Sequence, residues 1–139
     1  MEKILVGYDG TEQSERALEF AIKISQEIMT QTLEIHLAYV VEKPHGLADP
    51  VPEEAMESLQ RTGQEVLSNG ARIIKKRLET PVVHLEFGSP PEKLLELADK
   101  LKPDLIVIGI ANHPTSERIL GTVSSLLFKT RRYPVLGVP

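Results

Sequence analysis

The chain has 139 residues, of which 41% are hydrophobic and 26% charged, and its formal net charge is −4. This length predicts one domain, spanning residues 1–139, with a single substantial core. The net negative charge argues against a nucleic-acid partner, because nucleic-acid-binding domains neutralise phosphates with clustered cations. The absence of cysteine excludes disulfides, thiolate metal ligands and cysteine nucleophiles.

The hydrophobic residues are also distributed unlike those of a membrane protein. No apolar stretch approaches the ~20 residues that span a bilayer. The apolar run at the start of the chain is too short for a signal peptide. We therefore expect a cytoplasmic protein without a membrane partner.

The first half of the chain alternates strand patterns with helix patterns. The sequence "KILVGYDG" at 3–10 predicts a buried strand that ends in a turn. Apolar residues then recur at three-and-four spacing over 11–28, as in an amphipathic helix. A second strand is predicted at 33–41, where β-forming residues dominate. The proline-rich stretch 42–52 predicts a loop, and a long helix follows over 53–78. Two glycines on the apolar face of this helix suggest close approach to a sheet.

A third strand, "PVVHLEFG" at 81–88, leads into the clearest helix start of the chain. Ser89 can cap this helix, and Glu92 stands three residues later, as in a capping box. Pro91 falls in the first turn, where proline is favoured. Pro103 ends the helix.

The stretch 104–109, "DLIVIG", is the most apolar strand and is expected at the centre of a parallel sheet. A helix over 122–130 and a final strand over 133–139 complete the order. This alternation predicts an α/β fold: an open five-stranded parallel sheet of the Rossmann-like kind, with helices on both faces and right-handed crossovers.

A ligand site is expected at one edge of this sheet. Open α/β sheets bind ligands outside the carboxyl ends of their strands, where the strand order reverses. If the first and fourth strands are neighbours, Tyr8, Asp9 and Gly10 face the segment 109–112 across a crevice. A helix that begins near Gly121 would bring unpaired amides to the same edge, and these favour an anion such as phosphate.

Several groups could serve a ligand at this edge. Gly109 and Gly121 permit close backbone approach, Asp9 could accept ribose hydroxyls or hold a metal ion, and hydroxyl donors follow at Thr122 and Ser124. The spacing is neither a Walker A motif nor GxGxxG, and it equally fits a strand-to-helix turn without a ligand. Asp9 could also simply cap the turn that follows it.

Three blocks of the sequence resemble the universal stress protein family. They are "ILVGYDGTEQSERAL", "GSPPEKLLELADKLKPDLIVIG" and "GTVSS…YPVLGV", and they extend over essentially the whole chain in the family's order. The resemblance implies an adenine nucleotide alpha hydrolase-like fold with five strands. It also implies binding of ATP, AMP or ADP, with Mg or Mn as a metal partner, and a homodimer formed through the last strand, 133–138.

The resemblance also assigns individual residues. Asp9 matches the aspartate that lies against the ribose and metal, and Val40 matches the second-strand residue that touches adenine. The nucleotide-binding motif Gly-x2-Gly-x9-Gly-Ser/Thr follows the fourth strand in this family. Its matching positions are Gly109, Asn112, Gly121, Thr122, Val123 and Ser124.

The chain departs from this motif at its second glycine. Asn112 stands there, and eight residues instead of nine separate it from Gly121. Asn tolerates a left-handed backbone better than most residues, but its side chain would crowd a phosphate. Pro114 removes an amide donor from the same loop.

We therefore expect a universal stress protein that binds an adenine nucleotide for a regulatory or protective role in the stress response, and that is not an enzyme. The alternative is a member that has lost the nucleotide and acts as a dimeric interaction module. A small α/β enzyme using Asp9, Thr122 and Ser124 ranks last. His36, His45 and His84 show no metal-ligand spacing and are interpreted as structural or exposed.

Overall fold

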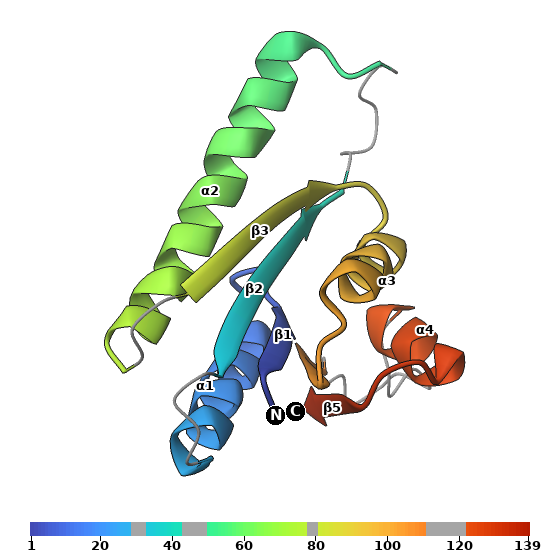
Figure 1. Cartoon of the computed structure of the whole chain (residues 1–139). Helices are drawn as coiled ribbons and strands as arrows, with labels where there is room; N and C mark the ends of the chain where they lie inside the picture. Colours follow the sequence, from blue (N-terminus) through green and yellow to red (C-terminus); the bar gives the residue numbers. More distant parts are fainter. Residues whose placement is uncertain (29–32, 43–49, 78–80, 111–121) are drawn as a thin grey trace.

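The structure is a computed structural model that describes residues 1–28, 33–42, 50–77, 81–110 and 122–139, without the side chain of Thr122. Strands and helices alternate along the chain (Figure 1). In order they are β1 (Lys3–Gly7), α1 (Glu12–Glu27), β2 (Glu34–Val41), α2 (Glu53–Lys75), β3 (Pro81–Phe87), α3 (Pro90–Leu101), β4 (Leu105–Gly109), α4 (Thr122–Thr130) and β5 (Val135–Val138).

The five strands form one parallel sheet in the order β3-β2-β1-β4-β5. This confirms the predicted α/β fold. β1 and β4 are neighbours, paired from Ile4 with Leu105 to Val6 with Val107. The middle strand is therefore β1, whereas the apolar pattern of 104–109 predicted β4. The two strands bury their central residues in the same way, so apolar character could not separate them.

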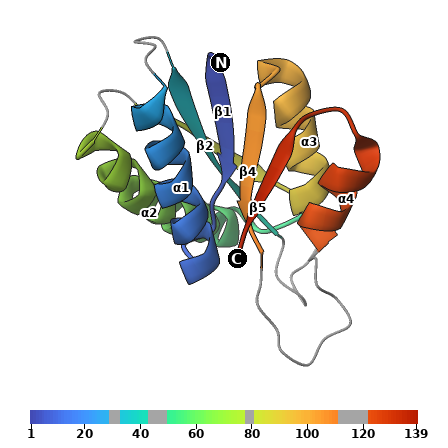
Figure 2. The same cartoon turned by 90° about the horizontal axis from the view of Figure 1, so that it is seen from below.

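Helices cover both faces of the sheet, α1 and α2 on one and α3 and α4 on the other (Figure 2). Each face carries its own apolar cluster. Val6, Leu37 and Val107 face α1 and α2, whereas their neighbours Leu5, Ala38 and Ile106 face α3 and α4. This is the alternation that the period of two along a strand requires.

The two glycines of α2 bring this helix close to the sheet, as the sequence predicted. A methyl group on Gly63 would lie 2.6 Å from Cδ1 of Leu85, and one on Gly70 would lie 2.5 Å from Cδ2 of Leu37. Both glycines are buried. α2 therefore packs by its backbone where larger residues would hold it away.

The start of α3 differs from the prediction. Ser89 is the N-cap residue, but its side chain makes no capping hydrogen bond, so the expected capping box is wrong. Pro90 and Pro91 occupy the first two helical positions. A capping side chain accepts from the second or third amide, and Pro91 has no N–H to offer. The fixed φ angles of the two prolines start this helix instead.

Candidate functional site

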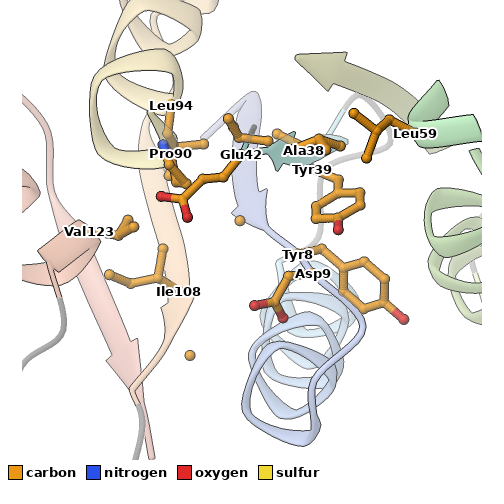
Figure 3. Close-up of a pocket in the computed structure, with 14 residues that line it drawn as sticks. Tyr8, Asp9, Ala38, Tyr39, Glu42, Leu59, Pro90, Leu94, Ile108 and Val123 are labelled. Carbon is orange, nitrogen blue, oxygen red and sulfur yellow. The ribbon is translucent and has the colours of Figure 1, made fainter. Parts of the chain in front are cut away.

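A pocket of about 560 Å³ opens at the carboxyl ends of the strands, where β1 and β4 lie side by side. This is the edge at which the sequence analysis expected a ligand. The connections from β1 and β4 leave in opposite directions there, which makes it the point of strand reversal. The lining comes from the ends of β1, β2 and β4 and from three helices (Figure 3). The lining residues are Gly7, Tyr8, Asp9, Ala38, Tyr39, Val40, Val41, Glu42, Leu59, Pro90, Leu94, Ile108, Gly109 and Val123.

Asp9 follows β1 and lies at the pocket with an exposed side chain. Its Oδ1 accepts hydrogen bonds from the Thr11 amide at 3.0 Å and from the Thr11 hydroxyl at 2.6 Å. The Thr11 hydroxyl in turn accepts from the Ser14 amide at 3.3 Å and caps α1. Asp9 therefore caps the turn that follows it, which is one of the two roles that the sequence suggested for this residue. The same bonds hold its carboxylate at the pocket.

Gly10 and Tyr8 flank Asp9 but contribute differently. Gly10 has φ +82°, a conformation that side chains rarely adopt, so glycine is required by the turn itself. Tyr8 is 3% exposed, and its ring packs against Gly70 of α2. Burial, followed by the nearby carboxylates of Glu15 and Asp9, raises the pKa of the Tyr8 phenol. The Tyr8 ring thus belongs to the core beneath the pocket.

Val40 and Gly109 line the pocket from β2 and β4. The sequence predicted that Gly109 allows a phosphate to come close to the backbone. In the structure, the space beside Gly109 is taken by the backbone of α1. A methyl group on Gly109 would stand 2.5 Å from the backbone carbon and oxygen of Gln13, in the first turn of α1. The packing of α1 against β4 therefore requires glycine at position 109, whether or not a ligand approaches.

The first turn of α4 reaches the pocket through Val123. Ser124, which the motif assigned to phosphate, is buried at 3% exposure. Asn112 and Gly121 lie outside the described residues, as does the side chain of Thr122. The structure thus brings Tyr8, Asp9, Val40, Gly109 and Val123 together around one pocket.

Glu42 is a pocket residue that the sequence analysis missed. It follows β2 directly, and its carboxylate enters the pocket beside Pro90 and Leu94 of α3 (Figure 3). Asp9 enters from the end of β1, so two carboxylates share the pocket. The signal was present in the sequence, because Glu42 succeeds its strand as closely as Asp9 succeeds β1. The prolines that follow it predict a loop over 42–52, and this prediction gives Glu42 no role.

The described side chains around Asp9 would not be enough to bind a metal ion. Within the ranges that the structure describes, no group of three or more His, Cys, Asp or Glu side chains could hold a metal ion. The oxygens of a bound ligand would have to complete the coordination of a cation at Asp9. In the same ranges, no helix is long and apolar enough to cross a membrane.

An open parallel sheet of this order, with a pocket at its point of strand reversal, is a Rossmann-like fold of the adenine nucleotide alpha hydrolase-like type. The sequence pattern of the universal stress protein family matches residues 1–139. The chain belongs to this family. It is 34% identical over 145 residues to universal stress protein MJ0531 of Methanocaldococcus jannaschii, which covers 99% of this chain and 81% of that protein.

Solved structures of the family share the fold. Universal stress protein UspA from Lactobacillus plantarum superposes with a TM-score of 0.81 at 20% identity, covering 99% of this chain and 97% of the other. A family protein from Arabidopsis thaliana, solved with AMP bound, gives 0.69 at 18% identity, covering 99% and 91%. A universal stress protein solved in complex with cAMP gives 0.71 at 23% identity, covering 99% and 97%.

Proposed function

We propose that this universal stress protein binds an adenine nucleotide, such as ATP, ADP or AMP, in the pocket between the ends of β1 and β4. The observation that carries the proposal is the pocket itself, which combines an acidic side chain, apolar strand ends and a helix start at the point of strand reversal. The AMP and cAMP complexes of proteins with the same fold support it. The role of binding would be regulatory or protective in the stress response.

Each wall of the pocket suits a different part of a nucleotide. Val40 and Leu59 offer apolar surface to a purine ring. Asp9, held by Thr11, can accept hydrogen bonds from ribose hydroxyls. The α4 helix begins at Thr122, and its first amides and dipole favour a phosphate near Val123.

The charge of the pocket points to a metal partner for a polyphosphate. Asp9 and Glu42 are the ionised side chains among its described lining residues. A triphosphate would meet two carboxylates there, and a divalent cation such as Mg²⁺ or Mn²⁺ would offset the repulsion. We expect ATP to bind at least about tenfold more weakly when EDTA removes the cation, and AMP to respond less.

The decisive experiment uses two valine substitutions of the same chemistry. Val40→Glu adds a third carboxylate inside the pocket, whereas Val83→Glu changes a side chain that is 47% exposed on β3 and away from it. By isothermal titration calorimetry, Val40→Glu should weaken Mg-ATP binding by about tenfold or more, and Val83→Glu should not. Circular dichroism controls for folding. Equal affinities of the two variants would place the site elsewhere.

A simpler measurement addresses the alternative function. Protein purified without added nucleotide is denatured, and its supernatant is assayed for adenine nucleotides. A thermal shift with millimolar Mg-ATP is recorded in parallel. If neither nucleotide nor shift is found, the interaction module becomes the better description of the protein.

We also propose that the protein does not turn nucleotides over. The described lining of the pocket holds no histidine or lysine that could act as a general base, and its two carboxylates, Asp9 and Glu42, are exposed to solvent. Phosphate release from Mg-ATP should remain at the buffer rate. Steady turnover that disappears in Asp9→Ala would identify an enzyme instead.

A homodimer through the last strand completes the proposal. β5 is an edge strand of the sheet, and an unpaired strand edge favours pairing with a second chain. Phe128, beside Gly137 of β5, is 39% exposed and could be covered there. Light scattering should give twice the 15.5 kDa chain mass. A monomer at all concentrations would exclude this assembly.

A further inference from the structure

Two histidines far apart in the sequence meet on the sheet. His36 of β2 and His84 of β3 lie on the same face, because Ala38, two residues beyond His36, is the register partner of His84. Nδ1 of His36 lies 2.9 Å from Nε2 of His84. The rings are nearly parallel, at 16°, and their centroids are 5.2 Å apart, much farther than the nitrogens. The two facing nitrogens therefore share a hydrogen bond. We call these residues the histidine pair.

The histidine pair leaves one polar atom without a partner. His36 is 5% exposed, and its Nε2 is buried with no hydrogen bond among the described residues. The nearest carboxylate oxygen, Oε1 of Glu34, is 3.8 Å away, which is beyond hydrogen-bond length. A buried polar group without a partner costs stability, so its presence calls for an explanation.

We propose that the histidine pair is a proton-binding site joining β2 to the edge strand β3: the folded sheet accommodates one added proton there, and a second added proton separates the two rings. This site is independent of nucleotide binding. The histidine pair lies on β2 and β3, and neither histidine lines the pocket.

The proton positions follow from the geometry. With both rings neutral, one hydrogen lies between the facing nitrogens. Glu34 favours the tautomer in which His36 Nε2 carries its hydrogen, because a carboxylate attracts an N–H and repels a lone pair. His84 Nε2 then donates to His36 Nδ1, and His84 Nδ1 is left with a lone pair.

The first added proton goes to that lone pair. It converts His84 to the imidazolium, which still donates through Nε2 to His36 Nδ1, and the bond becomes charge-assisted. A second proton could bind only at His36 Nδ1. Two N–H groups would then face each other at 2.9 Å between two cations, so the rings must part.

The surroundings disfavour the second charge. Lys3 of β1 opposes this charge, whereas the carboxylates of Glu34 of β2 and Glu86 of β3 favour it, so burial decides the balance. From the facing helix α3, Leu94, Leu95, Leu97 and Ala98 belong to the buried cluster on this side of the sheet. Burial is the main cause that lowers the pKa of both imidazoles below 6.5, and for His84 the second cause is His36 itself.

The sign of the effect on stability follows from these lowered pKa values. Below pH 6.5 the unfolded chain binds protons that the folded histidine pair resists. Stability is therefore fully present above about pH 6.5 and declines as the pH falls toward the folded-state pKa values. Among the described strands β3 is an edge strand that pairs with β2 alone, so it is the element that loses its attachment.

The test is an NMR titration of the imidazole nitrogens from about pH 8 to about pH 5. His45→Gln and His113→Gln remove the other two histidines from the background. At the upper pH, a scalar coupling should cross the hydrogen bond between the facing nitrogens. On acidification the pair should titrate in two separate steps, as coupled groups do.

Two matched variants keep a hydrogen-bonding group but remove one charge: His84→Gln, whose amide replaces Nε2, and His36→Asn, whose amide replaces Nδ1. In each, the remaining histidine should titrate in one step, at least about one pH unit above the lower step of the pair. Between about pH 6.5 and 5, the unfolding equilibrium constant should rise more steeply with falling pH in the parent than in either variant.

The proposal is overturned if no coupling crosses the two nitrogens at the upper pH, or if each histidine titrates at the same midpoint with and without its partner. Should His36→Asn fail to fold, His84→Gln carries the comparison alone, because the His84 ring is only partly buried.

Discussion

The layer beneath α2 and the rim of the pocket both hold glycines in close contact with their surroundings, but the atoms that they contact differ in kind. In α2, the atoms nearest to a methyl group on Gly63 or Gly70 are the ends of leucine side chains, which can rotate away. At the pocket rim, a methyl group on Gly109 would meet the backbone of Gln13, which cannot. The core layer can therefore adapt to an added atom, whereas the rim is rigid. One substitution, glycine to alanine, measures this difference at three positions.

Gly109→Ala should have the largest effect. The new methyl group would stand 2.5 Å from the Gln13 carbonyl, so α1 would have to move away from β4. We expect a loss of about 3 kcal/mol in the free energy of unfolding, at the upper end for overpacking. Urea denaturation measures it. A stability equal to that of the parent would mean that the rim is no more rigid than the core.

Gly70→Ala should have an intermediate effect. The methyl group would meet Leu37 at 2.5 Å and the Tyr8 ring at 3.0 Å. Leu37 can rotate, but the buried Tyr8 ring has less freedom. Against a packing cost of about 2 kcal/mol stands a helix-propensity gain of up to about 1 kcal/mol. The expected net loss is about 1 kcal/mol, measured by the same denaturation.

Gly63→Ala should be nearly neutral. Its neighbours are the methyl groups of Leu85 at 2.6 and 3.3 Å and of Val41 at 3.4 Å. A rotation of Leu85 would relieve the first contact, and the gain in helix propensity is the same as at Gly70. We expect a change within about 0.5 kcal/mol, and a loss as large as that of Gly109→Ala would contradict the contrast.

Glu42→Gln should leave the fold unchanged, because the side chain is exposed. It removes one of the two pocket carboxylates, so ATP without a divalent cation should bind about threefold more tightly. Calorimetry in EDTA measures this change. The matched control is Glu27→Gln at the far end of α1, where no change in affinity is expected.

The contrast between these glycines also shows what the sequence could predict. The apolar spacing of 53–78 placed Gly63 and Gly70 against the sheet, because helical periodicity is a local property. The close neighbour of Gly109 is Gln13, far away in the sequence, and only the pairing of β1 with β4 brings the two together. A local pattern could predict that close contact requires glycine at position 109, but it could not identify Gln13 as the neighbour.

The histidine pair illustrates the same limit. His36 and His84 are 48 residues apart, so no local pattern in the sequence joins them. Their contact depends on the register of β2 with β3. The position of Asp9 could be predicted from the sequence, because a strand followed by Asp-Gly and a helix places this residue at the sheet edge by local pattern alone.

Asp104 ties the first residues of the chain to the start of β4. Its carboxylate accepts from the amides of Glu2 at 2.6 Å and Lys3 at 2.9 Å, and its own amide donates to the Lys3 carbonyl at 2.9 Å. During synthesis, β1 is made first, but it cannot pair with β4 until most of the polypeptide has left the ribosome. A nascent chain that stalls before position 104 exposes one side of its central strand, and chaperones that hold extended apolar segments should capture it there.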